Sequence, residues 1–424
     1  MQSSHLFAPL PLPNGSTIPN RIAKAAMEEN LAVAGQLPGD GIVRLYGAWA
    51  DGGAGLLITG NVMIDGRAMT GPGGIVLQAG TPLQPFRDWA KAGRRGGAQL
   101  WMQLNHPGRQ VLAAMGGNTW APSAVALDLG KHSKLFGQPQ AMSEAQIHEI
   151  IRRFADSAVL AEQAGFNGVQ IHAAHGYLLS QFLSPLTNRR TDQWGGSIDN
   201  RARLLVETIK AVRARVAPQF AVAVKLNLAD FQRGGFDVAD ARRVVELLNQ
   251  LPVDLLELSG GSYEAPAMQG RTADGRTLAR EAYFLEFARD IAAIASMPVM
   301  TTGGIRRPAV AQQVLDSGVA MVGIGTALAQ VPDLPARWRN GDNLSAPQPQ
   351  VNWNDKVLAA LATMAMVRRQ LQRLGTGKPV LTSPSPLLTL IRDQLRLKRL
   401  TARYRRWLAR QDDRQPRNAM QTQS

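Results

Sequence analysis

The chain has 424 residues, 45% of them hydrophobic, which is enough for a large buried core. The absence of cysteine excludes disulfides, cysteine-ligated zinc, iron–sulfur clusters and cysteine nucleophiles. The net charge is +15, and it is unevenly distributed along the chain. Residues 342–424 hold 15 of the 47 Lys and Arg residues and only 5 of the 32 Asp and Glu residues, which leaves a net charge of +5 on residues 1–341. This small charge weakens the case for nucleic-acid binding by residues 1–341.

The N-terminal residues MQSSHLFAPLPLPNG lack a basic segment followed by an apolar one, so no secretory signal is expected. The longest apolar run, Val357 to Val367, is shorter than the roughly 20 residues needed to cross a bilayer. We therefore expect a cytoplasmic protein without a spanning helix.

Short apolar runs typical of buried strands alternate with segments of helical spacing along residues 21–324. The expected strands are residues 21–26, 56–59, 99–104, 169–171, 221–226, 254–258, 298–302 and 321–324. The expected helices are residues 41–50, 82–95, 143–164, 200–216, 237–250, 280–295 and 308–317. Eight such βα units predict an α/β protein with a (β/α)8 TIM barrel over residues 1–341, its parallel strands buried on both faces.

A doubly wound open sheet is the alternative fold. That fold usually carries a Gly-x-Gly-x-x-Gly motif after its first strand. The nearest sequence here, Gly52-Gly53-Ala54-Gly55, comes before an expected strand, so the barrel is favoured.

The segment from Asn105 to Met142 is far longer than a usual connection, which indicates a functional loop. We expect it to shape a substrate pocket together with Tyr263-Glu264-Ala265-Pro266, which follows the sixth strand. Ser143 and Gln146 have the spacing of a capping box, which predicts that a helix begins there.

The stretch from Gly165 to Arg201 holds the strongest candidates for catalysis. His172, His175 and Tyr177 follow the expected strand at residues 169–171, and strand ends carry the chemistry of parallel barrels. The two histidines could instead be metal ligands, but the segment offers no third ligand. A third interpretation is purely structural, with a buried histidine, a surface histidine and a packing tyrosine.

This stretch resembles the signature of the Old Yellow Enzyme family of flavin-dependent ene-reductases, from a divergent subgroup. The resemblance implies that His172 and His175 bind a carbonyl oxygen of the substrate and that Tyr177 supplies a proton. It also implies FMN as the cofactor, NADH or NADPH as the reductant, and a small electron-poor alkene as the substrate. Neutral imidazoles can donate N–H bonds to such an oxygen, and a tyrosine hydroxyl can act as a general acid.

Other positions match the family's flavin site and are expected to bind the cofactor: Ala25, Ala26, Met27, Glu28, Gly60, Gln103, Lys225, Gly303, Gly304, Gly325 and Thr326. The family usually has proline where this chain has Ala26, and threonine or cysteine where it has Glu28. It usually has arginine where this chain has Lys225 and Thr326. Glu28 is expected to alter the redox behaviour of the flavin. Arg306 or Arg307 would compensate for the charge that Thr326 lacks.

Lys225 lies inside an apolar strand, where an unpaired cation is costly. One interpretation is that it faces the barrel mouth and stabilises a reduced, anionic flavin. The other is a buried ion pair, with Glu257 as its partner.

Other functions have partial support in the sequence. The family's longer branch, with an iron–sulfur cluster, is disfavoured because the chain has no cysteine. A flavin barrel that reduces a tRNA base would suit the basic tail, but such enzymes typically use a cysteine acid, so no nucleic-acid partner is expected. A flavin barrel with a different physiological electron acceptor and a barrel without catalytic activity stay open.

Residues 342–424 are expected to form a separate basic, helical extension, with a linker at 342–350 and a helix at 353–374. Apolar residues roughly follow helical spacing through 387–410, namely Leu388, Ile391, Leu395, Leu400, Tyr404, Trp407 and Leu408. Arginine and lysine lie between them. This pattern is typical of peripheral contact with an anionic membrane or an acidic partner. It equally fits docking on the barrel or on a second subunit in a homo-oligomer.

Overall fold

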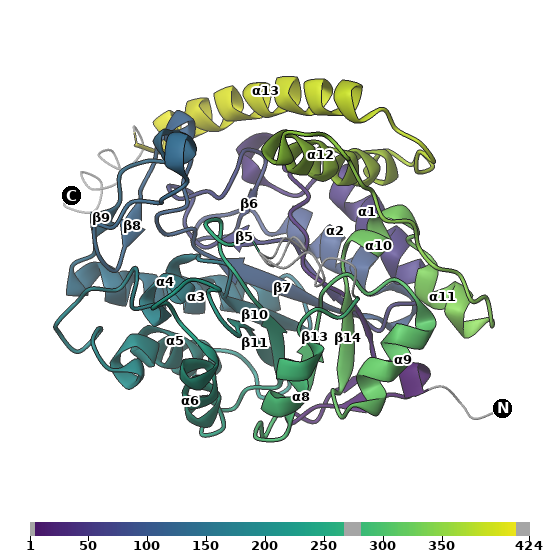
Figure 1. The fold of residues 1–424 in the computed structure, drawn as a ribbon, viewed down its shortest axis with the longest axis horizontal. Coiled ribbons are helices and arrows are strands. Elements are labelled where there is room, and N and C mark those ends of the chain that lie inside the picture. Colours follow the sequence, from purple (N-terminus) through teal and green to yellow (C-terminus); the bar gives the residue numbers. More distant parts are fainter. Residues whose placement is uncertain (1–4, 267–280, 413–424) are drawn as a thin grey trace.

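Eight parallel strands close into a barrel in this computed structural model, which describes residues 5–266 and 281–412 (Figure 1). In order around the barrel they are β3 (Ile22–Lys24), β4 (Leu56–Ile58), β7 (Gln99–Asn105), β10 (Gly168–Ala173), β11 (Ala221–Asn227), β12 (Leu255–Ser259), β13 (Val299–Thr301) and β14 (Met321–Ile324). The ring closes because β14 pairs with β3 and β10 pairs with β7. The predicted (β/α)8 TIM barrel is confirmed.

The inside of the barrel near the amino ends of its strands is filled by apolar side chains. Leu56, Trp101 and Met321 belong to this cluster and are fully buried. A short antiparallel pair, β1 (Leu10–Pro11) and β2 (Thr17–Ile18), packs into the same cluster. Polar side chains inside the barrel are therefore gathered toward the carboxyl ends of the strands.

Helices surround the barrel (Figure 1). They are α1 (Asp40–Asp51), α2 (Gln84–Gly93), α3 (Glu144–Gln163), α4 (Leu178–Leu183), α5 (Ile198–Arg213), α6 (Val238–Leu248), α8 (Leu285–Ala292), α9 (Pro308–Asp316), α10 (Thr326–Gln330) and α11 (Leu334–Arg339). The predicted capping box at the start of α3 is confirmed: the Ser143 hydroxyl accepts from the Gln146 N–H, and the Gln146 side chain accepts from the Ser143 N–H.

The helix expected at residues 280–295 is shorter than predicted. Arg280 lies outside the described residues, and α8 begins at Leu285. Ala282 has a left-handed φ of +56°, and its N–H donates to the carbonyl of Gly303 (2.7 Å). The segment before α8 is thus held by the turn after β13, and a helix cannot include a left-handed residue there.

The long loop at 105–142 contains short elements of its own. Two strands within it, β8 (Trp120–Ala121) and β9 (Gln140–Ala141), pair in parallel, and Leu112 bridges to Phe136. Strands β5 (Val62–Met63) and β6 (Ile75–Val76) extend the sheet beyond the end of β7.

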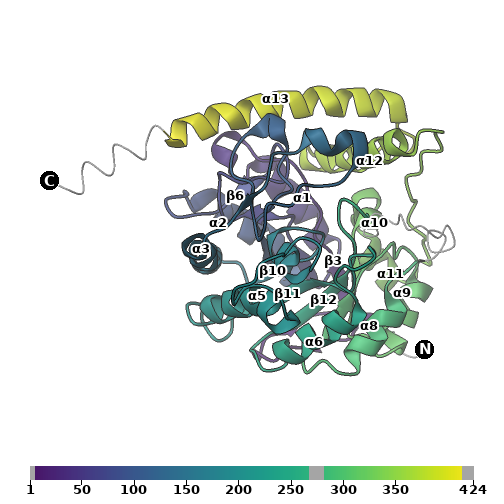
Figure 2. The same ribbon diagram turned by 60° about the vertical axis from the view of Figure 1, so that its left-hand side comes forward.

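The C-terminal extension forms two helices, α12 (Lys356–Gly375) and α13 (Pro386–Asp412), which lie side by side over the carboxyl-end face of the barrel (Figures 1 and 2). The second half of α13 docks on the barrel. The Tyr404 hydroxyl donates to the carbonyl of Gly66 (2.8 Å), and Leu400 is buried beside Gly73. Docking on the barrel is therefore the arrangement of this half of the apolar stripe.

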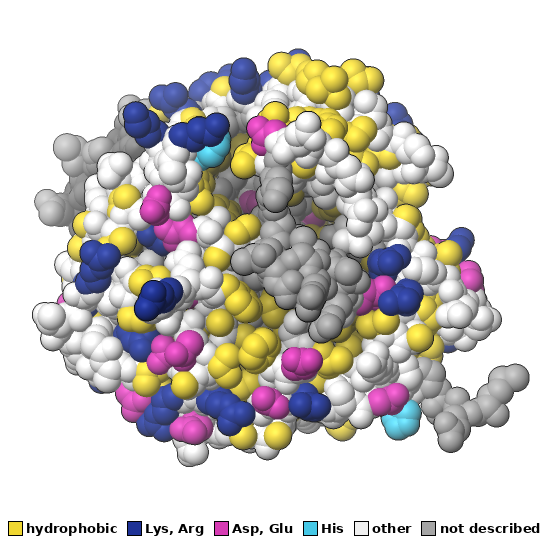
Figure 3. Space-filling model, viewed as in Figure 1, with side chains coloured by type: hydrophobic (Ala, Val, Ile, Leu, Met, Phe, Trp, Pro, Cys, Tyr) yellow, Lys and Arg dark blue, Asp and Glu magenta, His cyan; other side chains and the backbone are white. Residues whose placement is uncertain are grey.

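The apolar side chains along the first half of α13 are exposed to solvent. Leu387, Leu388, Ile391 and Leu395 are about half exposed, and Figure 3 shows hydrophobic side chains gathered along this part of the α12 and α13 rim. Within the described residues, no helix combines the length and the hydrophobicity that crossing a bilayer requires.

Candidate active site

The rings of His172, His175 and Tyr177 meet where β10 ends. The ring centroid of His172 lies 5.0 Å from that of His175 and 4.9 Å from that of Tyr177, with the ring edges facing ring planes. His172 and Tyr177 are both buried. The structure brings together the three residues that the sequence singled out for catalysis.

The backbone after β10 aims the two imidazoles. The Ala174 N–H donates to Nδ1 of His172 (3.2 Å), so a neutral His172 carries its proton on Nε2. No described residue accepts a hydrogen bond from that Nε2. His175 has a left-handed φ of +61°, held by a bond from its own N–H to the side chain of Asn227 (3.0 Å), and its Nε2 lies 2.7 Å from the Ser259 hydroxyl.

Both imidazoles are neutral at ordinary pH. Burial lowers the pKa of His172 and of His175 well below the usual value, and the nearby Lys225 ammonium lowers each further. A neutral imidazole has one N–H donor, so each ring can give one hydrogen bond to a substrate oxygen without carrying a charge.

Tyr177 is a protonated phenol with a phenolic neighbour. Burial raises its pKa well above the usual value, and the adjacent Tyr263 and the Glu28 carboxylate raise it further. Its hydroxyl lies 3.2 Å from that of Tyr263, which follows β12. Tyr177 therefore keeps its proton at neutral pH and has a second hydroxyl within hydrogen-bond distance.

A chain of four buried polar side chains crosses the barrel from β7 to β11. The Gln103 amide donates to Gln170 (2.7 Å), the Gln170 amide donates to Glu257 (2.7 Å), and Glu257 forms an ion pair with Lys225 (2.9 Å). The ion pair between Lys225 and Glu257, one of the two interpretations of Lys225 given by the sequence, is therefore present. Lys225 is also opposite His172 in the strand register, so the pair lies beside the histidines.

Expected cofactor residues after β3 come close to those after β14. The Ala25 N–H donates to the carbonyl of Ile324 (3.0 Å), and Met27 lies beside Gly325. Ala26, between them, is half-buried, whereas Thr326 is exposed at the start of α10.

Gly60, after β4, is constrained by protein groups. A Cβ there would overlap with the Glu29 carboxylate and the Met27 carbonyl, so only glycine fits. Its N–H donates to Glu29 (3.1 Å) and Tyr46 (3.1 Å), and Glu29 also forms a buried ion pair with Lys24 (3.5 Å). The need for glycine at this position follows from this network.

The glycine turn after β13 is covered by an aromatic ring. Gly303 (φ +124°) and Gly304 (φ +71°) adopt conformations that favour glycine, and the Tyr283 ring lies against both. Arg306 or Arg307 was expected to compensate for the positive charge that Thr326 lacks. Both form ion pairs with Glu281 (3.3 and 2.7 Å).

Glu28 faces a large cavity at the barrel mouth. Its carboxylate accepts from the Thr70 hydroxyl (2.6 Å), and burial raises its pKa. The cavity has a volume of about 1560 Å³ and is also lined by Tyr263 and by residues of α12.

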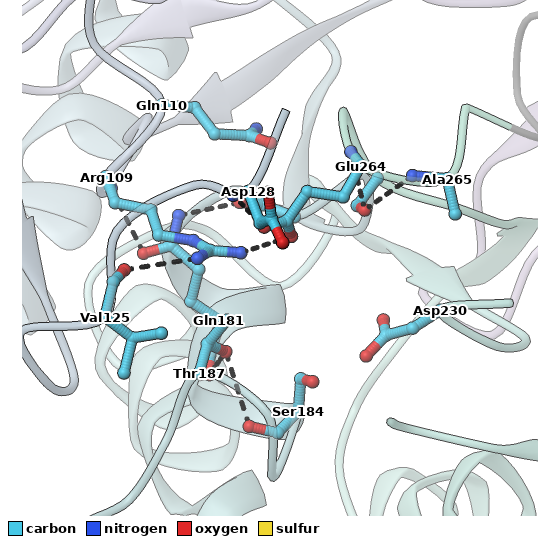
Figure 4. A network of polar contacts seen from close by, with 12 residues as sticks. Arg109, Gln110, Val125, Asp128, Gln181, Ser184, Thr187, Asp230, Glu264 and Ala265 are labelled. Carbon is cyan, nitrogen blue, oxygen red and sulfur yellow. Dashed lines mark hydrogen bonds and ion pairs between the residues drawn. The ribbon is translucent and has the colours of Figure 1, made fainter. Parts of the chain in front are cut away.

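An ion pair fixes two walls of this cavity to each other (Figure 4). Arg109, in the long loop, pairs with Glu264 after β12 (2.5 Å) and donates to the carbonyls of Val125 (3.1 Å) and Ala126 (2.8 Å). The predicted pocket-shaping segments are therefore joined where Tyr263 reaches Tyr177.

Some residues of the site were not selected from the sequence: Gln170, Ser259, Thr70 and Glu29. Gln170 and Ser259 are polar residues within or at the end of apolar strand runs, which is the signal that could have found them. Thr70 and Glu29 lie in irregular segments without such a signal. Within residues 5–266 and 281–412, no three His, Asp or Glu side chains come together as metal ligands.

A closed parallel barrel with convergent polar side chains at its strand carboxyl ends defines a TIM-barrel enzyme. The chain belongs to the NADH:flavin oxidoreductase / NADH oxidase family, whose model matches residues 5–345. The protein is therefore an NAD(P)H:flavin oxidoreductase that uses FMN with NADH or NADPH. The predicted family and cofactors are confirmed.

Relatives and solved structures agree with this assignment. The NADH-dependent flavin oxidoreductase iliE of Hypocrea jecorina (strain QM6a) is 37% identical over 357 residues, covering 79% of this chain and 89% of the relative. The old yellow enzyme homologue from Zymomonas mobilis has a TM-score of 0.69 and 27% identity, covering 80% of this chain and 94% of its own. Morphinone reductase in complex with tetrahydroNAD has a TM-score of 0.68 and 26% identity, covering 81% and 93%.

The site is chemically suited to FMN. Gln103 offers an amide and Lys225 a cation inside the barrel, and the polar edge of a flavin ring can accept hydrogen bonds from both kinds of group. Gly303 and Gly304 carry no side chains of their own over the backbone N–H groups of this turn, and the Tyr283 ring beside them would border a phosphate placed there.

Proposed function

We propose that the protein reduces the C=C bond of an electron-poor alkene of the enone type. The observation that carries this proposal is the convergence of His172, His175 and Tyr177 at the end of β10, with centroids about 5 Å apart between neighbouring rings. Two neutral N–H donors and one phenolic acid are the groups that such a reduction needs from the protein.

His172 and His175 would bind the carbonyl oxygen of the substrate. The free Nε2–H of His172 is the first donor, and His175 would donate from Nδ1 when the Ser259 hydroxyl donates to its Nε2. Two donors fixed in a buried site stabilise the negative charge that develops on the oxygen, since they need no reorganisation as it forms.

Tyr177 would supply the proton to the carbon next to the carbonyl. Its raised pKa keeps the hydroxyl protonated, and Tyr263 can share the hydrogen bond and help replace the proton. Bound FMN supplies the hydride for the other carbon of the double bond.

Gln103 and Lys225 would hold the cofactor from inside the barrel, together with Ala25, Ala26, Met27, Glu28, Gly60, Gly303, Gly304, Gly325 and Thr326. Lys225 pairs with Glu257 and lies close enough to His172 for its positive charge to lower the pKa of that imidazole.

An anaerobic titration tests the proposal. NADH or NADPH should bleach the flavin absorbance, and an enone added afterwards should restore it with saturated ketone as the product. Flavin that is reduced but not reoxidised by any of several enones would contradict the proposal and leave a flavin enzyme with a different electron acceptor. Protein that stays colourless after incubation with FMN would contradict cofactor binding itself.

We also propose that residues 1–341 form the FMN-binding barrel and that the outer face of α13 in the 342–424 extension contacts an anionic membrane surface. Its exposed leucines and isoleucine lie beside Arg392, Lys398 and Arg399, which are also exposed. Figure 3 shows basic side chains along one end of this rim and hydrophobic ones along the other. A second copy would bring equal positive charge against this face, so an anionic partner is favoured.

A further inference from the structure

The cavity above the barrel mouth is lined by Tyr263, the hydrogen-bond neighbour of Tyr177, and extends away from the candidate catalytic residues. It reaches from Glu28 and Tyr263 to helix α12, and its volume of about 1560 Å³ exceeds the roughly 300–1,000 Å³ of most small-molecule pockets. Cofactor and substrate would share the part beside Glu28. The part beside α12 has no role in the chemistry proposed above.

One face of α12 forms the far wall of this cavity. The lining residues Val357, Ala360, Leu361, Met364 and Arg368 follow helical spacing. Leu361 and Met364 are 36% and 37% exposed, whereas Ala362 and Ala365 of the same helix are buried. The helix packs against α1, α10 and α13. Large apolar side chains that face a cavity rather than the core gain free energy when an apolar ligand covers them.

Other walls of the cavity have the same apolar character. Leu135 and Phe136 come from the long loop and Phe231 from the segment after β11, and Leu135 and Phe231 are largely exposed. Of the eleven exposed large hydrophobic residues among those described, five line this one cavity and four lie on the first half of α13.

The arginines of the lining are already neutralised. Arg368 pairs with Asp393 on α13 (2.5 Å), and Arg307 pairs with Glu281 (2.7 Å). An anionic ligand group would have to break one of these pairs, whereas an uncharged apolar group would not. The far part of the cavity therefore suits an uncharged, apolar body.

We propose that α12 is the specificity wall of the substrate cavity and selects alkenes that carry a large, uncharged apolar group. This inference rests on the proposed function for the site beside Tyr177 and names the substrate class. The C-terminal extension is then part of the enzyme's substrate site, in addition to any contact it makes outside.

Two enones with the same reacting ring test the inference: cyclohex-2-enone, and the same ring with a biphenyl group at C5. The full-length holoenzyme is compared with Leu361→Gln, which makes the wall polar, and with Ala360→Phe, which fills it. Leu395→Gln is the matched control, because Leu395 is 52% exposed on α13 but does not line the cavity.

The ratio of kcat/KM for the biphenyl enone to that for cyclohexenone should fall about tenfold in Leu361→Gln and Ala360→Phe and stay unchanged in Leu395→Gln. The Kd of the biphenyl enone for the oxidised holoenzyme, measured from the flavin absorbance, should rise in parallel. An unchanged ratio and Kd in both α12 variants would overturn the inference. If neither enone is reduced but the biphenyl compound still binds in an α12-dependent manner, the proposed reaction fails and the specificity wall stands.

Discussion

The hydroxyl groups of Tyr177 and Tyr263 lie 3.2 Å apart, although the two residues follow different strands of the barrel. The expected proton donor is thus hydrogen-bonded to the residue that also borders the large cavity. Under the proposed function, Tyr177 gives the proton and Tyr263 supports it through this hydrogen bond.

Tyr177→Phe should lower kcat for enone reduction by about 10²-fold or more, because the variant lacks the general acid. Stopped-flow reduction of the flavin by NAD(P)H should change little, since that half of the reaction needs no proton from Tyr177. Tyr263→Phe retains the acid and should lose less than tenfold. Unchanged turnover of several enones by Tyr177→Phe would mean that the proton comes from another source.

Removal of an imidazole should weaken binding of phenolic ligands, whose oxygen occupies the place of the substrate oxygen. His172→Ala loses a donor to a charged oxygen, which is worth about 1.5–3 kcal/mol, so Kd should rise roughly 10- to 100-fold. His172→Asn keeps an N–H donor and should retain part of the affinity. A titration that follows the flavin absorbance measures both, and equal Kd values for wild type and His172→Ala would refute the assigned role.

The Lys225–Glu257 ion pair can be separated from a role of Lys225 toward the cofactor. Lys225→Met leaves Glu257 buried without its cation and should lower the free energy of unfolding by about 3–5 kcal/mol. The double variant Lys225→Met/Glu257→Gln keeps a partner for Gln170 and should recover most of that stability. If Lys225 also stabilises reduced flavin, the double variant should still show a lower flavin reduction potential; a wild-type potential would leave Lys225 with the structural role alone.

His106 should make stability depend on pH. It is buried against Trp120, and its Nδ1 accepts from the Gly108 N–H (3.1 Å), so protonation would break this bond. Burial lowers its pKa to about 4, although the nearby Asp65 opposes the shift. The unfolded chain therefore takes up a proton near pH 6.5 that the folded chain refuses until about pH 4.

Stability from this histidine is fully present above pH 6.5 and falls by about 1.4 kcal/mol per pH unit below it, about 3 kcal/mol in all. Urea unfolding at several pH values between 7.5 and 4.5 measures this slope. His106→Asn retains an acceptor for Gly108 and should have a flatter slope, while the contributions of His172 and His175 cancel in the comparison. Parallel slopes for the two proteins would exclude His106 as the cause.

Much of the fold could be predicted because buried strands are short apolar runs. The strand Met321–Ile324 was predicted with the bounds that it has, and the Ser143 capping box marked the start of α3 correctly. The start of α8 was predicted too early because it depends on a bond between Ala282 and Gly303, which lie on different units of the barrel.

The part of the candidate site whose residues are close together in the sequence could be predicted. His172, His175 and Tyr177 are within six positions of one another, so one strand end carries all three. The link from Gln103 through Gln170 to Glu257 depends on which strands are neighbours and on their register, which a single sequence does not contain. For the same reason the stripe on α13 could not be divided into a docked and an exposed half.

That division makes the membrane contact testable without removing the helix. A chain that ends at Gly377 would lose the docking of Tyr404 and Leu400 as well as the outer face, so Leu388→Asp/Ile391→Asp is the sharper variant. Each exposed arginine or lysine near an anionic bilayer adds roughly 1 kcal/mol, and salt weakens this attraction. Full-length protein should therefore co-sediment with anionic vesicles, less with neutral ones, and dissociate at high salt. The double variant should bind several-fold less because two carboxylates replace apolar contacts. Equal, salt-insensitive behaviour of wild type and variant on both kinds of vesicle would exclude a membrane role and leave α13 as a helix that only packs on the barrel.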